Sequence, residues 1–134
     1  MTDHITQPAV DGCPFCPDNW RNLKVVDQSH PDGIVIEPLN PVTTGHVLVI
    51  GAGHAESAAA DPVQAGCLMR VAASYVQRKG IAANIVTSIG SAATQTVFHT
   101  HLHVVPRRVG DGLPLPWTPQ KLRPRPGAVV RVVE

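Results

Sequence analysis

Short apolar runs bounded by turn-forming residues recur along the chain, and runs of this kind predict β-strands. Residues 23–26 and 33–36 are rich in β-branched side chains, and the turn residues 29–33 predict that they form an antiparallel hairpin. Residues 42–50 and 84–89 predict two further strands, and residues 97–105 predict a fifth.

The pattern changes to a period of 3.6 after Asp61, which predicts a helix. Apolar residues then recur at helical spacing: Leu68, Val71, Ala72, Tyr75 and Val76. Asp61 suits the N-cap, Pro62 suits the first turn and Gly80 suits the C-terminal stop. Strands joined by hairpin connections, together with one such helix, predict an α+β domain in which an antiparallel sheet is covered on one face.

Three histidines occupy alternate positions of the fifth predicted strand: His99, His101 and His103. Side chains two positions apart in a strand point to the same face, so the three imidazoles are expected on one surface. The other surface is expected to carry Phe98, Thr100, Leu102 and Val104. Imidazole serves as nucleophile, proton carrier or metal ligand near neutral pH. Because close imidazoles gain little from packing, this pattern indicates chemistry rather than a solvated sheet face.

The composition limits the classes of protein that fit the chain. Its 134 residues suffice for one ordinary domain with a single core. Lys and Arg number 11 against 10 Asp and Glu, and a net charge of +1 gives no bias toward nucleic acid. No apolar run approaches the roughly 20 residues of a membrane span, and residues 1–4 do not begin a secretion signal. We therefore expect a cytoplasmic protein with no nucleic acid and no membrane as partner.

Residues 1–110 are expected to form the folded domain, and residues 111–134 a proline-rich tail of the same domain. The tail prolines disfavour regular structure over most of its length: Pro114, Pro116, Pro119, Pro124 and Pro126. Residues 128–133 are apolar enough either to add an edge strand or to remain part of a loosely attached tail.

Two kinds of chemistry are compatible with the histidine run. A zinc hydrolase commonly joins a His-x-His pair to a nearby acidic ligand, but the residues after His103 are apolar or basic. In a regular strand the outer imidazoles would also lie about 13 Å apart, too far to share one ion. Covalent catalysis fits better, because a central imidazole can attack phosphorus while its neighbours move protons and stabilise charge. The small residues at 90–94 would let backbone N–H groups approach phosphate oxygens.

Cys13 and Cys16 have the spacing of a redox pair or of half a zinc site. A redox pair usually opens a helix after a central strand, whereas this pair lies in an irregular segment with Pro17 directly after it, so zinc is favoured. A pair of reduced, partly buried thiols is the alternative. Cys67, in the predicted helix, is interpreted as a small core residue.

Together these segments resemble the histidine triad (HIT) family, of the bacterial type with an amino-terminal Cys-x-x-Cys zinc motif. The resemblance extends from Cys13 to Arg107. Besides the three histidines it rests on Asn40, Pro41, Gly45 to Ile50, His54, Gly90, Ala93, Gln95, Thr96 and Val97. It implies a HIT-like fold, namely a five-stranded antiparallel sheet with one main helix and a short second helix, extended across a homodimer.

The resemblance also implies a nucleotide hydrolase or nucleotidyl transferase. Such an enzyme attacks the α-phosphate of a purine nucleotide, in a nucleoside phosphoramidate or a dinucleoside polyphosphate, through a covalent nucleotidyl-histidine. His101 would be the nucleophile and His103 would contact the phosphate and pass a proton to the leaving group, while His99 and His46 would orient the nucleophile. Nucleotide contacts would come from Leu39, Asn40, Ser88, Thr94, Gln95 and Thr96, with Gln95 and Thr96 along the phosphates. A noncatalytic nucleotide-binding or interaction protein and a metal-dependent hydrolase are the alternatives.

For the cysteine pair, the resemblance implies a structural zinc site made of Cys13, Cys16, His54 and His99, which takes no part in the chemistry. The chain departs from the family pattern near the expected ribose, where Pro38 replaces a common Asp or Asn and leaves Glu37 as a candidate substitute. Ser88 and Thr94 replace a frequent Asn and a frequent Gly beside the phosphate loop. These departures indicate a shifted substrate preference.

Overall fold

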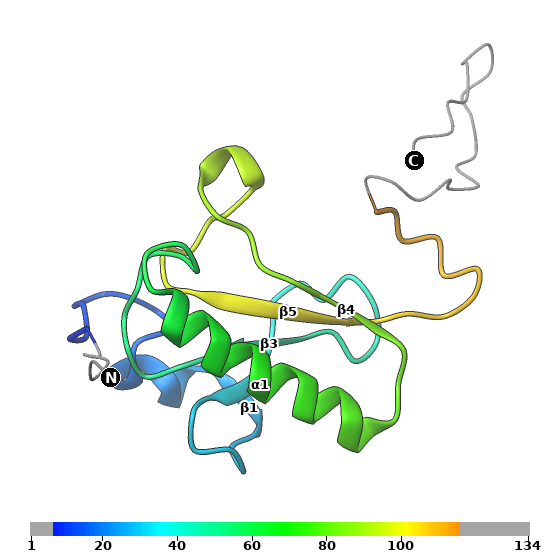
Figure 1. Cartoon of the computed structure of the whole chain (residues 1–134), viewed down its shortest axis with the longest axis horizontal. Coiled ribbons are helices and arrows are strands. Elements are labelled where there is room, and N and C mark those ends of the chain that lie inside the picture. Colours follow the sequence, from blue (N-terminus) through cyan, green and yellow to red (C-terminus); the bar gives the residue numbers. More distant parts are fainter. Residues whose placement is uncertain (1–6, 116–134) are drawn as a thin grey trace.

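The computed structural model describes residues 7–115, which form a five-stranded antiparallel sheet with one long helix beside it (Figure 1). The strands are β1 (Lys24–Asp27), β2 (Ile34–Glu37), β3 (Val47–Ile50), β4 (Ala83–Val86) and β5 (His101–Pro106). The helix is α1 (Pro62–Lys79), and the short 3-10 helices are η1 (Pro17–Asn22) and η2 (Ser91–Ala93). The strand order β1-β2-β3-β5-β4 places β5 inside the sheet. The predicted α+β class, with five antiparallel strands and one main helix, is confirmed, and the short helical elements among the described residues are 3-10 helices.

Capping chemistry sets both ends of α1. The Asp61 carboxylate accepts a hydrogen bond of 3.1 Å from the backbone N–H of Gln64, and Pro62 occupies the first turn. Gly80 adopts a left-handed conformation with a φ of 61°, and its N–H donates to the Val76 carbonyl at 2.9 Å. The helix predicted from the sequence is therefore confirmed at both ends.

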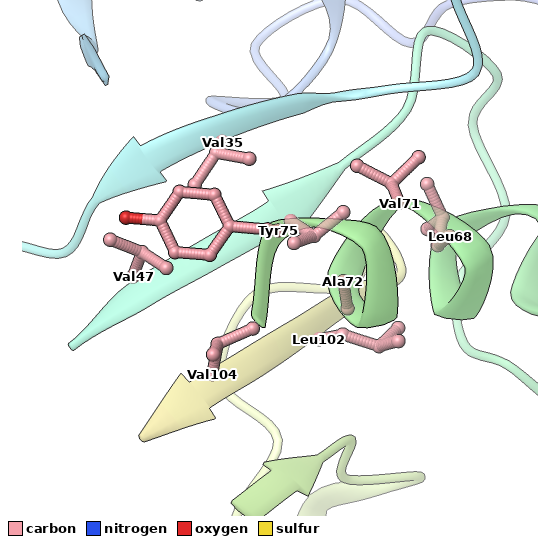
Figure 2. Packing of buried hydrophobic residues seen from close by; sticks show 9 residues of the cluster. Val35, Val47, Leu68, Val71, Ala72, Tyr75, Leu102 and Val104 are labelled. Atoms are coloured by element: carbon pink, nitrogen blue, oxygen red, sulfur yellow. The ribbon is translucent and has the colours of Figure 1, made fainter. Parts of the chain in front are cut away.

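One face of the sheet packs against α1 and forms a hydrophobic cluster (Figure 2). Its buried members are Val35, Val47, Val49, Leu68, Val71, Ala72, Tyr75, Leu102 and Val104. The helix contributes the positions selected by the 3.6-residue period, and burying a side chain of this size is worth about 1.5–3 kcal/mol. This packing fixes α1 on one face of β3 and β5 and leaves the other face for a site.

The opposite face carries a second cluster, in which the amino-terminal segment packs on the sheet. Its buried members are Cys13, Phe15, Cys16, Ile34, Ile36, Leu48 and Ile50. In β5, His101 pairs with Ile50 and His103 pairs with Leu48, so both imidazoles share this face. The period of two along β5 thus separates its histidines from the core residue between them, Leu102.

β3 and β4 are shorter than the sequence pattern predicts. β3 begins at Val47 because Gly45 takes a φ of 86° and the His46 N–H donates to the Thr43 carbonyl at 3.2 Å, which closes a turn. β4 ends at Val86, and the next residue uses its side chain instead, since the Thr87 hydroxyl donates to the His101 carbonyl at 2.8 Å. Both strands were predicted, while the start of β3 and the end of β4 are set by these local interactions.

The expectation of three equivalent imidazoles on one strand is wrong. β5 begins at His101, because the backbone N–H of Thr100 donates to the Ala55 carbonyl at 2.8 Å, outside the sheet. His99 therefore lies in a bend before the strand, with its Nδ1 3.4 Å from the sulfur of Cys13. Phe98 is 45% exposed rather than directed into the core.

Arg107 ties the chain beyond β5 to β4. Its guanidinium donates to the Asp111 carboxylate at 2.9 and 3.1 Å, to Oδ1 of Asn84 at 2.6 Å and to the Leu113 carbonyl at 2.7 Å. The remainder of the predicted tail, including 128–133, lies outside the described residues. Between residues 7 and 115, no helix combines the length and the apolar character that crossing a membrane requires.

Candidate active site and metal centre

A cavity of about 790 Å³ opens on the sheet face that carries the second cluster, with His101 and His103 in its wall. Ile36, Leu48 and His103 lie in register across β2, β3 and β5, so the wall beside the imidazoles is apolar. Phe15 closes the cavity from the amino-terminal segment. A hollow of this volume, mostly apolar with a few convergent polar groups, is typical of small-molecule sites.

His101 is held with its Nε2 unprotonated. Its Nδ1 lies 2.8 Å from the backbone carbonyl oxygen of His99, and because a carbonyl only accepts, Nδ1 carries the ring proton. In the neutral imidazole the lone pair is then on Nε2. The ring packs against Phe15, and the residue is only 9% exposed. The site therefore gives His101 the form that a nucleophile requires.

A chain of hydrogen bonds gives His103 the opposite arrangement. The backbone N–H of Val42 donates to Nδ1 of His46 at 3.0 Å, so the proton of neutral His46 lies on Nε2. That Nε2 lies 2.9 Å from Nδ1 of His103, which must accept, so the proton of neutral His103 lies on its own Nε2. The rings of His101 and His103 are 5.3 Å apart between centroids. The lone pair on Nε2 of His101 and the N–H on Nε2 of His103 therefore belong to neighbouring rings.

Burial keeps these imidazoles neutral. It lowers the pKa of His46, and it lowers the pKa of His101 against the opposing effect of the hydrogen bond to the His99 carbonyl. Burial, with repulsion from His101 and His46, lowers the pKa of His103 to about 4. All three rings are consequently uncharged near pH 7, and the proton positions assigned above are those of the resting site.

Four side chains of the kind that bind zinc meet next to this cavity. Cys13, Cys16, His54 and His99 each offer one sulfur or nitrogen atom, and these atoms all lie within 4.8 Å of one another. Nδ1 of His99 is 3.4 Å from Sγ of Cys13 and 3.6 Å from Sγ of Cys16. Nδ1 of His54 is 3.4 Å from Sγ of Cys16. Tetrahedral zinc with bonds of about 2.0–2.3 Å spaces its ligand atoms roughly 3.3–3.8 Å apart, so the cluster has the size and donor set of a closed zinc site.

His99 is oriented as a metal ligand. Its Nε2–H donates to the Gly51 carbonyl at 2.9 Å, which leaves the Nδ1 lone pair toward the two sulfurs. Burial, together with repulsion from His54 and His101, lowers the pKa of His99 to about 4, so the ring has the neutral form that metals bind. Because the His99 carbonyl also holds the His101 proton, this residue connects the cluster to the candidate nucleophile.

A profile of the HIT domain family matches residues 24–110. The chain belongs to the HIT family. A HIT-like protein of Mycobacterium tuberculosis, whose name calls it uncharacterized, is 40% identical over 111 residues, 75% of this chain and 75% of that protein. Adenylylsulfatase HINT3 of Arabidopsis thaliana is 33% identical over 90 residues, 63% of this chain and 44% of that protein. A zinc-bound histidine triad family protein of Mycobacterium smegmatis has 32% identity and a TM-score of 0.63, covering 77% of this chain and 80% of that one.

HIT proteins are nucleotide-binding hydrolases and transferases, so the residues expected to contact a nucleotide are of interest. Leu39 and Thr96 line the cavity, and Leu39 is 99% exposed at its mouth. Asn40, Ser88 and Thr94 are not part of the lining, and Thr94 adopts a left-handed conformation with a φ of 73° after η2. The structure thus brings two of the expected contacts to the imidazoles.

Gln95, expected along the phosphates of a bound nucleotide, makes three hydrogen bonds to the backbone. Its Oε1 accepts from the Gly90 N–H at 2.8 Å, and its Nε2 donates to the carbonyls of Glu56 at 2.6 Å and Val97 at 3.0 Å. The side chain is buried and does not line the cavity. In this HIT protein it holds the loop before β5 in place.

Sequence reasoning missed the amino-terminal segment as part of the cavity wall. The segment contributes Gly12, Pro14, Phe15, Asn19 and Asn22. The lining also includes Glu37 and Pro38, which were expected near the ribose, and Leu23, Lys24, Ile36, Leu48 and Val97, which were not predicted as nucleotide contacts. The sequence did contain a signal for this contact, because Phe15 lies between Cys13 and Cys16. If both cysteines bind the same metal as His99, the segment between them lies beside His101. Glu37, the candidate substitute at the ribose, forms an ion pair of 2.8 Å with Lys24.

Proposed function

We propose that this HIT protein breaks the bond between the α-phosphorus of a nucleotide and its leaving group through a covalent nucleotidyl-histidine on His101. The observation that carries the proposal is the pair of opposite proton positions in one cavity. His101 offers a lone pair on Nε2, and His103 offers a proton on Nε2. A nucleophile beside a hydrogen-bond donor that can stabilise the departing atom suits a two-step displacement at phosphorus.

In the first step, Nε2 of His101 attacks the α-phosphorus. A nitrogen–phosphorus bond forms and the bond to the leaving group breaks. The Nε2–H of neutral His103 donates a hydrogen bond to the departing atom, which takes its proton from water. The imidazolium of His101 is stabilised by its Nδ1–H, which donates to the His99 carbonyl at 2.8 Å. In the second step a water oxygen attacks the phosphorus, and the proton that it releases returns to the solvent. The nitrogen–phosphorus bond breaks, the nucleoside monophosphate leaves, and His101 regains its resting form.

The substrate in this proposal is a purine nucleotide. The apolar wall formed by Phe15, Ile36 and Leu48 suits a flat base, while Leu39 and Thr96 contribute further contacts. Nucleoside phosphoramidates and dinucleoside polyphosphates are the first substrate classes. The name of the Arabidopsis relative, an adenylylsulfatase, adds nucleoside phosphosulfates as a third class.

The proposal includes one structural zinc ion held by Cys13, Cys16, His54 and His99. A closed site with four protein ligands supplies stability and no open coordination position for chemistry. The residues themselves do the positioning, since the cluster holds Phe15 against His101. Cys13 and Cys16 form no disulfide, and cysteines that serve as metal ligands fit a reducing compartment such as the cytoplasm.

A homodimer belongs to the same proposal. β4 lies at one edge of the sheet and pairs only with β5 among the described strands. An edge strand presents unpaired backbone groups that a second copy can use, as the extended sheet of the family resemblance requires. Sedimentation of the purified protein measures this directly, and a monomer at micromolar concentration would contradict it.

Rapid quenching with α-phosphate-labelled adenosine and guanosine substrates tests the chemistry. Label should appear on the protein within one turnover, and His101→Ala should lose both the label and at least about 1,000-fold in turnover. Nucleotide binding without label or turnover on any substrate class would instead identify a noncatalytic binding protein. Turnover that needs the metal but never labels the protein would favour the metal-dependent hydrolase.

A further inference from the structure

The turn that precedes β3 determines which way the hydrogen bond between His46 and His103 points. Within this turn the Val42 N–H donates to Nδ1 of His46 at 3.0 Å, which leaves the proton of neutral His46 on Nε2. Without that donor, His46 could carry its proton on Nδ1 and accept from His103 instead. Nε2 of His103 would then be unprotonated, which is the wrong form for donating a hydrogen bond to a leaving group.

Arg108 connects the end of β5 to this turn. One of its guanidinium N–H groups donates to the hydroxyl of Thr43 at 3.2 Å, and another donates to the carbonyl of Thr44 at 3.3 Å. A planar guanidinium suits two acceptors at once, whereas an ammonium group has no such fork. The neighbouring Arg107 is committed to Asp111, so Arg108 is the arginine of this pair that reaches the turn.

The turn has little other support. Its one internal backbone bond runs from the His46 N–H to the Thr43 carbonyl at 3.2 Å. Gly45 holds a φ of 86°, and a side chain there would approach the Pro106 ring to 3.2 Å. Thr44 and Gly45 are exposed. An exposed turn that contains glycine loses much conformational freedom when it orders, so a tie from outside the turn matters.

We propose that Arg108 is a positioning residue for the hydrogen bond that His103 donates to the leaving group, acting through the turn. By holding Thr43 and Thr44 it keeps the Val42 N–H on His46, and so keeps the proton of His103 on Nε2, the nitrogen that is not bonded to His46. The inference rests on the proposed function, because the proton position of His103 matters only where His103 serves as a hydrogen-bond donor. Arg108 itself needs no contact with the nucleotide.

Long-range proton–nitrogen NMR of the full chain tests the proton positions without any substrate. Near neutral pH, His46 and His103 of the wild type should each show the Nε2–H form alone. Arg108→Ala should show the Nδ1–H form of both rings at a population of about a tenth or more. Arg70→Ala is the matched control, because the Arg70 side chain is 70% exposed on α1 and distant from the turn in sequence. Unchanged proton positions in Arg108→Ala overturn the proposal.

Leaving-group dependence provides the kinetic readout. Arg108→Ala should lower kcat about fivefold for a nucleoside phosphoramidate of an alkylamine, which must be protonated to leave. It should leave kcat unchanged for a p-nitrophenyl nucleotide ester, whose leaving group departs without a proton. Arg108→Lys should recover part of the loss because it keeps one of the two bonds. An equal loss with both substrates would indicate a general structural effect and would overturn the proposal.

Thr43→Val examines the path through the turn, since it removes the hydroxyl acceptor at nearly constant volume. If Arg108 acts through Thr43, the double variant should lose no more than Arg108→Ala alone, whereas additive losses contradict this path. If Arg108→Ala does not fold, Thr43→Val and Arg108→Lys undergo the same two measurements. If the wild type turns over none of the substrates, the proposed function fails, and the NMR result alone decides the role of Arg108.

Discussion

The ring of Phe15 meets the ring of His101 edge to face, with 5.2 Å between centroids and 75° between planes. Phe15 lies between the two cysteines of the metal-ligand cluster and also lines the cavity. The amino-terminal segment therefore touches the candidate nucleophile on one side and the space for a substrate on the other. Substitutions in this segment should therefore have two separable effects: changing Phe15 should alter nucleotide binding, and changing a cysteine should alter stability.

Phe15→Leu is expected to weaken nucleotide binding about three- to tenfold, since an aromatic contact of this kind contributes roughly 0.5–1.5 kcal/mol beyond buried area. Titration calorimetry in a His101→Ala background measures this without turnover. Phe98→Leu is the matched control, because Phe98 is 45% exposed and is not part of the cavity wall. Equal affinities of the Phe15 and Phe98 variants would show that Phe15 does not contact the nucleotide.

The cluster should contain one zinc ion per chain in the purified protein. Cys13→Ser should lose the metal and lower the Tm by about 5–10 °C, because binding free energy at a structural zinc site is folding free energy. Cys67→Ser offers a matched control, since Cys67 lies on α1 and is outside the cluster. Elemental analysis and thermal unfolding check both variants. Full zinc content in Cys13→Ser, with an unchanged Tm, would contradict the assignment.

The helix and the two faces of the sheet could be predicted from the sequence because they depend on spacing alone. Leu68, Val71 and Tyr75 recur at 3.6 residues and are buried, and the period of two in β5 separates Leu102 from the histidines. The start of β5 could not be predicted, since it depends on a bond from Thr100 to Ala55, which is distant in sequence. Local spacing predicts which face a residue occupies, whereas the start of β5 depends on a tertiary contact.

The candidate site also contains features that the sequence indicated and features that only the structure shows. Family resemblance indicated the four cluster ligands, but spacing could not, because His54 is 38 residues and His99 is 83 residues from Cys16. The proton positions of His101 and His103 were also beyond the sequence. They depend on the carbonyl of His99 and the N–H of Val42, and backbone groups carry no sequence pattern of their own.

Protonation of His103 is expected to reduce stability as the pH falls. Its pKa is about 4 in the folded chain and returns to an ordinary value of about 6.5 on unfolding. Between these values the unfolded chain binds more protons, so the free energy of unfolding decreases as the pH falls from about 6.5 to about 4 and is unaffected by this group above that range.

Urea unfolding at about pH 7 and about pH 5 measures the effect. The wild type should lose more stability between the two conditions than His103→Gln, which has no group that titrates there and retains an acceptor for His46. The comparison cancels contributions from the cluster, which both proteins share. The same loss in both proteins would mean that the folded pKa of His103 is not lowered.

Gln95 and Thr96 are adjacent, yet their substitution should have different consequences. Gln95→Ala removes the three hydrogen bonds that this buried side chain makes to the backbone of Gly90, Glu56 and Val97, so it should reduce the free energy of unfolding by about 1–3 kcal/mol. Thr96→Ala removes a hydroxyl from the cavity wall and should change nucleotide affinity with little effect on stability. Denaturant unfolding and nucleotide titration measure the free energy of unfolding and the nucleotide affinity of each variant. If Gln95→Ala instead unfolds like the wild type and loses affinity, its side chain leaves the loop to meet the phosphates when a nucleotide binds.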